Sequence, residues 1–135
     1  MSEMHAPITA LYAALCGFLI LILAFLAVRQ RMKGGVLLGD GGQEAMQRAM
    51  RVMANASEYI PIMLFLMLLL EINGANAKNM HAAGIAILLG RGLHAWGFSR
   101  SSGTSSGRFN GTLITWMAIF VMSIANILSF IQHLN

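Results

Sequence analysis

Four long apolar stretches separated by short polar segments set the pattern of this chain. They cover residues 8–28, 49–70, 80–98 and 113–131. Each stretch is long enough to cross about 30 Å of hydrocarbon as a helix. The pattern predicts an all-α fold, a four-helix transmembrane bundle. One domain of residues 1–135 is expected, with helices at about 8–32, 44–72, 79–100 and 108–132.

The composition supports a membrane protein. Hydrophobic residues make up 57% of the chain and charged residues only 10%, against about 25% charged in soluble domains. The first apolar stretch is too long for a signal peptide, and residues 1–7 contain no Lys or Arg, so we expect it to remain as a helix. The single cysteine, Cys16, excludes a disulfide framework within the chain.

The basic residues predict the topology. They gather around the first connection (Arg29, Arg31, Lys33, Arg48 and Arg51) and the third (Arg91, Arg100 and Arg108), and Lys78 alone lies in the second. By the positive-inside rule the first and third connections are cytoplasmic, and both termini are outside the cytoplasm. Topology therefore accounts for the net charge of +4, and we expect no nucleic-acid partner.

The second apolar stretch begins with a polar stripe. At 100° per residue Arg48, Arg51, Asn55 and Glu58 fall within an arc of roughly 80° on a helix. Ionisable groups at membrane depth usually face a bundle interior or a watery cavity, so the stripe is a candidate site. The alternative for Arg48 is a contact with lipid headgroups.

Depth relates this stripe to the third stretch. Glu58 lies 12 residues before Leu70 and Arg91 lies 11 residues after Met80. If the second and third helices are antiparallel neighbours, Glu58 and Arg91 lie at similar height and can pair. His94 then lies one turn closer to the cytoplasmic end. A purely structural ion pair is the alternative. No His, Cys or carboxylate set has ligand spacing, so we expect no metal.

These residues carry a family resemblance. Residues 51–61, RVMANASEYIP, resemble the R-x-x-x-N-x-x-E-x-x-P signature of the MAPEG family, the membrane-associated proteins of eicosanoid and glutathione metabolism. Residues 91–101, RGLHAWGFSRS, resemble the family's third helix, and Arg108 with the following TLITW resembles the start of its fourth. The resemblance covers nearly the whole chain. It implies a homotrimer that binds glutathione between subunits on the cytoplasmic side.

The resemblance also implies residue roles. Arg108 matches the arginine that activates the thiol if three extra residues are accepted in the loop 99–107, and Arg100 is its rival. Arg31 matches a first-helix arginine at the mouth of the site, with an expected catalytic role. Phe98 replaces a tyrosine of the leukotriene-forming branch. Expected glutathione-binding residues are Arg48, Arg51, Asn55, Glu58, Tyr59, Arg91 and His94.

The expected function is that of a membrane-bound glutathione transferase, extending to glutathione peroxidase activity, that adds the glutathione thiolate to apolar electrophiles from the lipid. The expected location is a bacterial inner membrane. One alternative is a non-catalytic membrane protein that binds a lipid or a partner protein in the cleft between subunits. Another is a proton-coupled carrier using Glu58, Arg91 and His94, although four short helices lack the paired repeats of transporters.

Overall fold

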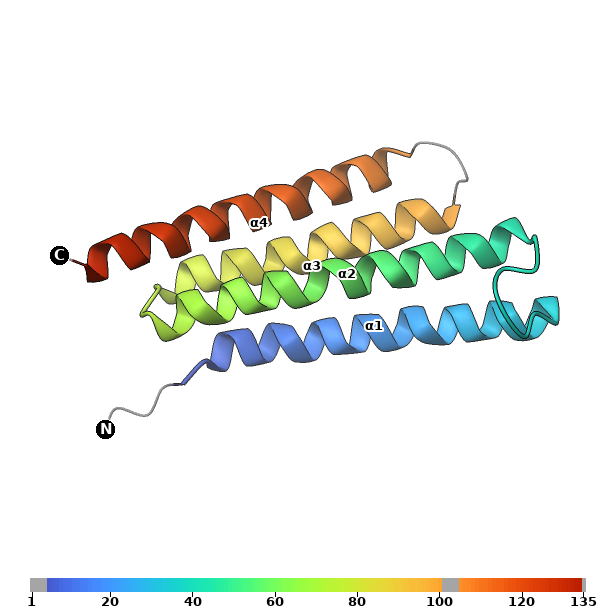
Figure 1. Cartoon of the computed structure of the whole chain (residues 1–135), viewed down its shortest axis with the longest axis horizontal. Helices are drawn as coiled ribbons and strands as arrows, with labels where there is room; N and C mark the ends of the chain where they lie inside the picture. Colours follow the sequence, from blue (N-terminus) through green and yellow to red (C-terminus); the bar gives the residue numbers. More distant parts are fainter. Residues whose placement is uncertain (1–4, 101–104, 135) are drawn as a thin grey trace.

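The chain forms a bundle of four helices. The structure, a computed structural model, describes residues 5–100 and 105–134, and the side chains of all of these except 98–100. Over that part of the chain the helices are α1 (Pro7–Gly34), α2 (Glu44–Ile72), α3 (Ala77–Arg100) and α4 (Ser106–His133). Figure 1 shows them running alternately in opposite directions, with both chain termini at one end and the α1–α2 connection at the other.

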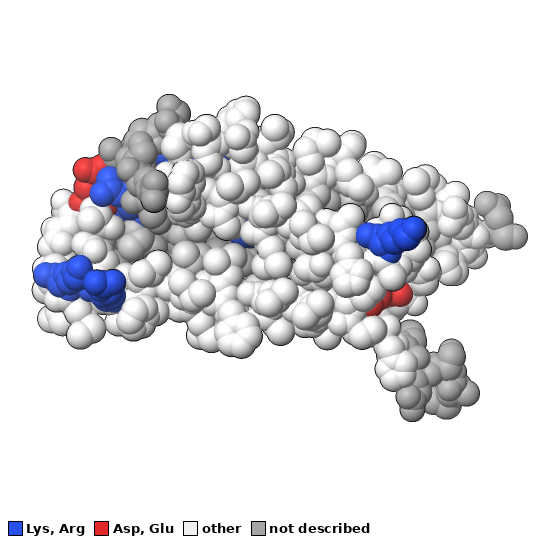
Figure 2. All heavy atoms as spheres, turned by 180° about the vertical axis from the view of Figure 1, so that it is seen from behind, with Lys and Arg blue, Asp and Glu red and all other residues white. Residues whose placement is uncertain are grey.

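Three of the four helices have the length and composition of membrane spans. In the described part of the chain these are α1, α2 and α4. The sequence predicts four spans, but α3 falls below the apolar composition of the others, because it includes Lys78, Arg91 and His94 together with several glycines. The surface agrees with a lipid setting: Figure 2 shows Lys and Arg mainly at one end and a broad uncharged face beside them.

The core runs along one face of α2. Met46, Met63 and Met67 have no exposed surface, and Val52 and Ile60 are nearly as buried. At 100° per residue these positions fall within an arc of roughly 120°, which places them on one stripe of the helix. Unbranched methionine side chains fill irregular gaps between helices. The opposite face of α2 is left for other contacts.

The outer two helices do not touch each other. Along the described residues α1 contacts α2 and α3, α4 contacts α2 and α3, and α1 and α4 share no contact. Figure 1 accordingly shows α2 and α3 between them. A site that uses side chains from both α1 and α4 would therefore have to reach across α2 or α3, or combine two copies of the chain.

Close packing of α3 on α4 depends on glycine. A Cβ added to Gly111 would lie 2.5 Å from the backbone nitrogen of His94 and 2.7 Å from the carbonyl oxygen of Gly90. Both are backbone atoms that cannot rotate aside. Small residues allow such close approach of membrane helices.

A carboxylate fixes the start of α1. The Glu71 carboxylate, near the end of α2, accepts hydrogen bonds from the backbone nitrogens of Ile8 at 2.9 Å and Thr9 at 2.7 Å. Ala6, at the N-cap position, offers no side-chain acceptor. Glu71 therefore satisfies donors that the helix itself leaves open, and its negative charge lies at the positive end of the helix dipole.

Candidate functional site

A buried arginine forms the centre of the candidate site. Arg91 on α3 is 2% exposed. Its Nε and Nη2 donate to the Thr115 hydroxyl at 3.1 and 2.7 Å, and its Nη1 donates to the Asn55 side-chain oxygen. The guanidinium carbon lies 5.2 Å from the centre of the Tyr59 ring, within cation–π range. One cation thus joins α2, α3 and α4.

The predicted ion pair between Glu58 and Arg91 is wrong. Depth was estimated correctly, because Arg91 contacts Asn55 and Tyr59, which lie on either side of Glu58 in height. The rotation of Glu58 about the helix axis was estimated wrongly, because Glu58 is about 100° from Tyr59 and its side chain is exposed. The stripe is therefore split. Its inner edge holds Arg91, and its outer edge faces away from the bundle.

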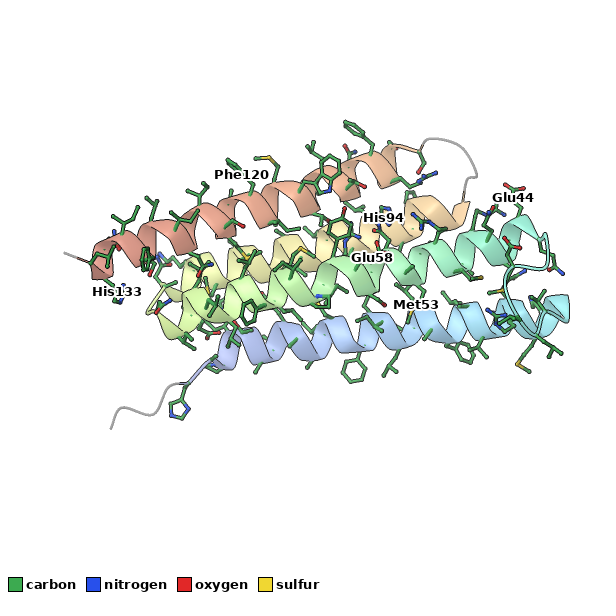
Figure 3. The ribbon with its side chains drawn as sticks, viewed as in Figure 1. Glu44, Met53, Glu58, His94, Phe120 and His133 are labelled. Atoms are coloured by element: carbon green, nitrogen blue, oxygen red, sulfur yellow. The ribbon has the colours of Figure 1, made fainter. Side chains whose placement is uncertain are left out.

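A cavity of about 580 Å³ lies beside this cluster, between the end of α3 and the first turns of α4. Its walls are formed by His94, Ser105, Ser106, Arg108, Phe109, Thr112, Leu113 and Trp116. His94 is 7% exposed, and Figure 3 shows it in the same half of the bundle as Glu58. The Trp116 indole nitrogen donates to the Tyr59 hydroxyl at 3.2 Å, so the cavity wall is tied to α2. The cavity combines a guanidinium with apolar walls.

The predicted site residues fall into separate places on one chain. Arg108 lines the cavity, whereas Arg51 and Glu58 are exposed on the outer edge of α2. The Nη1 atom of Arg31 donates to the carbonyl oxygens of Val36 and Gly39, at 3.4 and 3.2 Å, in the α1–α2 connection.

One further predicted residue, Arg48, lies apart from the cavity. Arg48 lies beside α1 and donates to Glu44 at 3.0 Å. The side chain of Arg100, the rival of Arg108, falls outside the described residues.

Sequence reasoning missed two residues of the cluster. Thr115 has no exposed surface and receives two of the Arg91 hydrogen bonds, while Trp116 bonds Tyr59. A signal was available for Thr115. Thr112 and Thr115 are three residues apart in a mainly apolar helix, which places two hydroxyls on one face. Nothing in the sequence distinguished Trp116 from a lipid-facing aromatic residue.

Comparison with known proteins identifies the family of this chain. The sequence model of the MAPEG family matches residues 9–128. The chain is 42% identical over 120 residues to the inner membrane protein YecN of Escherichia coli strain K12, covering 89% of this chain and 90% of that protein. The YecN protein of Escherichia coli O6:H1 gives the same values. This chain is therefore a membrane protein that belongs to the MAPEG family.

Proposed function

We propose that the protein is a glutathione transferase that works as a homotrimer and joins the glutathione thiolate to apolar electrophiles. The observation that carries the proposal is the 580 Å³ cavity, in which Arg108 lies among Phe109, Leu113 and Trp116. A guanidinium stays protonated and lowers the pKa of a thiol beside it. Apolar walls favour an apolar second substrate. One cavity therefore offers an environment for both reactants.

The exposed edge of α2 supports a site between subunits. Arg51 and Glu58 are exposed on a single chain, yet they lie on a helix that has the composition of a membrane span. Charged groups in contact with lipid are costly, and a neighbouring subunit or a watery cleft would remove that cost. Glutathione has two carboxylates and an ammonium, which match the guanidinium of Arg51 and the carboxylate of Glu58.

The position of Arg31 points to the same arrangement. Arg31 is on α1 and Arg108 on α4, and these helices do not touch in the described chain. We infer that a glutathione in contact with both lies between the α1 of one copy and the α4 of another. In this assembly Arg91 holds Asn55 and Tyr59 in position, because three of its nitrogens already donate to Asn55 and Thr115. We place the basic end at the cytoplasmic face, with α3 crossing the membrane beside the other helices.

The chemistry follows from the thiolate. Glutathione loses its thiol proton to water, the sulfur attacks an electrophilic carbon, and a carbon–sulfur bond forms. An aryl chloride then releases chloride, whereas an activated alkene gains a proton. Arg108 would stabilise the negative sulfur before the attack. A lipid hydroperoxide is a second class of electrophile, from which two glutathione molecules would yield the disulfide, the alcohol and water.

Titration of the purified protein with glutathione tests the proposal. We expect saturable binding, ultraviolet absorbance of a bound thiolate, and turnover of an apolar aryl chloride. Binding without thiolate absorbance or turnover would reject the transferase. The protein would then hold the tripeptide without activating it. Absence of binding would leave the non-catalytic alternative, a membrane protein whose cleft holds a lipid or a partner protein.

A further inference from the structure

A second cavity, of about 280 Å³, lies between α1 and α2 at the basic end of the bundle. It shares no wall with the α3–α4 cavity, because none of its lining residues comes from α3 or α4. Its lining residues are Leu26, Arg29, Gln30 and Lys33 of α1 with Ala45, Arg48 and Ala49 of α2. We refer to it as the α1–α2 groove.

The α1–α2 groove is mainly positively charged. Arg29, Lys33 and Arg48 line it, and no acidic residue is among the lining residues described. Glu44 accepts a hydrogen bond from Arg48 at 3.0 Å, and its single negative charge can offset only one of the three cations. The groove therefore has an excess of positive charge for a ligand to neutralise.

Two alanines of α2 leave space in the groove because their side chains are short. Ala45 and Ala49 lie one turn apart on α2 and face the same cavity. Their short side chains leave a volume several times the roughly 30 Å³ of one water molecule. Gln30 adds an amide that can donate a hydrogen bond to an anion. A small oxyanion, such as a phosphate group, matches both the size and the donor set.

The position of the groove favours a ligand that belongs to the membrane. Leu26 forms its inner wall and is 43% exposed, and Ile22 and Phe25, 57% and 66% exposed, continue α1 towards the middle of the bundle. Figure 2 shows the same transition from a basic end to an uncharged face. A phospholipid has this sequence of groups, with a phosphate at the surface and acyl chains inward. Basic pockets between transmembrane helices bind such headgroups.

We propose that the α1–α2 groove is a binding site for the phosphodiester headgroup of an anionic phospholipid, with Arg29, Lys33 and Arg48 contacting the phosphate and Leu26 contacting the start of an acyl chain. The site does not depend on the proposed glutathione chemistry. It also accounts for Arg48, which lies with α1 and not with the Arg91 cluster. The glutathione contact predicted for Arg48 is therefore not part of the proposed transferase site.

Lipid binding to the purified protein in a non-ionic detergent tests this site. The probes are phosphatidylglycerol, phosphatidylcholine and the soluble ester glycerol phosphate. Native mass spectrometry measures the lipid retained, and the thermal unfolding midpoint provides a second readout. We expect phosphatidylglycerol to bind and to raise the midpoint, with little effect of the other two. Equal binding of phosphatidylcholine or of glycerol phosphate would overturn the assignment to an anionic lipid.

Two kinds of variant separate a built site from general attraction to an anionic surface. Ala49→Leu fills the groove and keeps every charge, and it should abolish lipid retention. Ala45→Leu tests the same prediction if Ala49→Leu fails to fold. Arg29→Gln with Lys33→Gln should weaken binding about fivefold for each cation removed. Lys78→Gln, at the opposite end of the bundle, is the matched control and should bind as the wild type does. Wild-type binding by both leucine variants, or an equal loss in Lys78→Gln, would overturn the proposal.

Discussion

At the scale of single residues, the buried guanidinium of Arg91 needs hydrogen-bond acceptors from neighbouring helices. A charge removed from water must be hydrogen-bonded, and Arg91 meets this need through Asn55, Thr115 and the Tyr59 ring. The Thr115 hydroxyl is fully used, since it accepts twice from Arg91 and donates to the Gly111 carbonyl at 2.8 Å. The cluster therefore depends on a residue that carries no charge.

Replacing Thr115 measures this dependence. Thr115→Val keeps the shape but removes the acceptor of two Arg91 hydrogen bonds, so we expect a loss of roughly 1–3 kcal/mol in the free energy of unfolding. Denaturation in mixed micelles provides the measurement. Thr112→Val, the same change one turn earlier at a half-buried cavity wall, is the control and should have little effect. Equal stability of the two variants would mean that water or another group satisfies Arg91.

Arg51 and Arg108 have different roles in the proposed transferase, the first in glutathione binding and the second in thiol activation. Arg51→Ala should mainly weaken glutathione binding, by roughly 2–5 kcal/mol if the carboxylate contact is buried between subunits. Arg108→Ala should leave binding of an S-alkylated glutathione nearly intact, lower turnover, and shift thiolate formation to higher pH. Calorimetry and a pH titration of thiolate absorbance distinguish these effects. If Arg100→Ala abolishes thiolate formation and Arg108→Ala does not, the activating role belongs to Arg100.

The site could be predicted in part at this scale. Asn55 and Arg91 were recognised from their spacing and Tyr59 from the family resemblance, and the three lie together in the structure. The partner of Arg91 was predicted wrongly. Counting residues inward from the helix ends gives the height of a residue along the bundle but not the direction in which its side chain faces. Thr115 was missed because the spacing of Thr112 and Thr115 indicates one polar face of the helix but does not show which of the two hydroxyls is buried.

At the scale of helices, the contact between α3 and α4 determines the shape of the α3–α4 cavity. Gly111→Ala would place a Cβ 2.5 Å from the His94 backbone nitrogen, so the helices must separate. We expect a loss of about 1–3 kcal/mol in stability together with altered access to the cavity. Gly92→Ala is the matched control, since a Cβ there meets nothing within 4 Å. Thermal unfolding of both variants provides the test, and equal midpoints would contradict the close packing.

Prediction of the helices succeeded because hydrophobic length carries most of the signal. The chain forms the four helices that the apolar stretches predict, and α2 continues through Pro61. The weaker apolar character of α3 was not predicted, because residues 80–98 were judged by the length of the stretch although it contains Arg91 and His94. The Glu71 cap on α1 was also missed. A tertiary cap comes from a residue far along the chain, so local sequence cannot reveal it.

At the scale of the whole molecule, the proposed homotrimer would cover the exposed Arg51 and Glu58. We expect a native mass of three times 14.6 kDa, plus bound detergent or lipid. Native mass spectrometry and chemical crosslinking in the membrane provide the measurement. A monomer, or crosslinking that stops at dimers, would count against a glutathione site shared by α1 and α4 of different copies.

Orientation in the membrane is a separate prediction. The basic end should lie in the cytoplasm, so a topology reporter fused after Asn135 should be active on the outer side. The same reporter placed in the α1–α2 connection should be active in the cytoplasm. The reverse result would place both the α1–α2 groove and the α3–α4 cavity at the other face of the membrane.

The shared position of the two chain ends opens a route to counting active sites. Pro7 begins α1 and His133 ends α4 at the same end of the bundle (Figure 1). Short polar linkers could therefore join three copies into one polypeptide without crossing the bilayer. Such a concatemer would carry Arg108→Ala in one, two or all three segments. Activity that falls in equal steps would mean three independent centres, whereas complete loss at the first step would mean that the centres act only together.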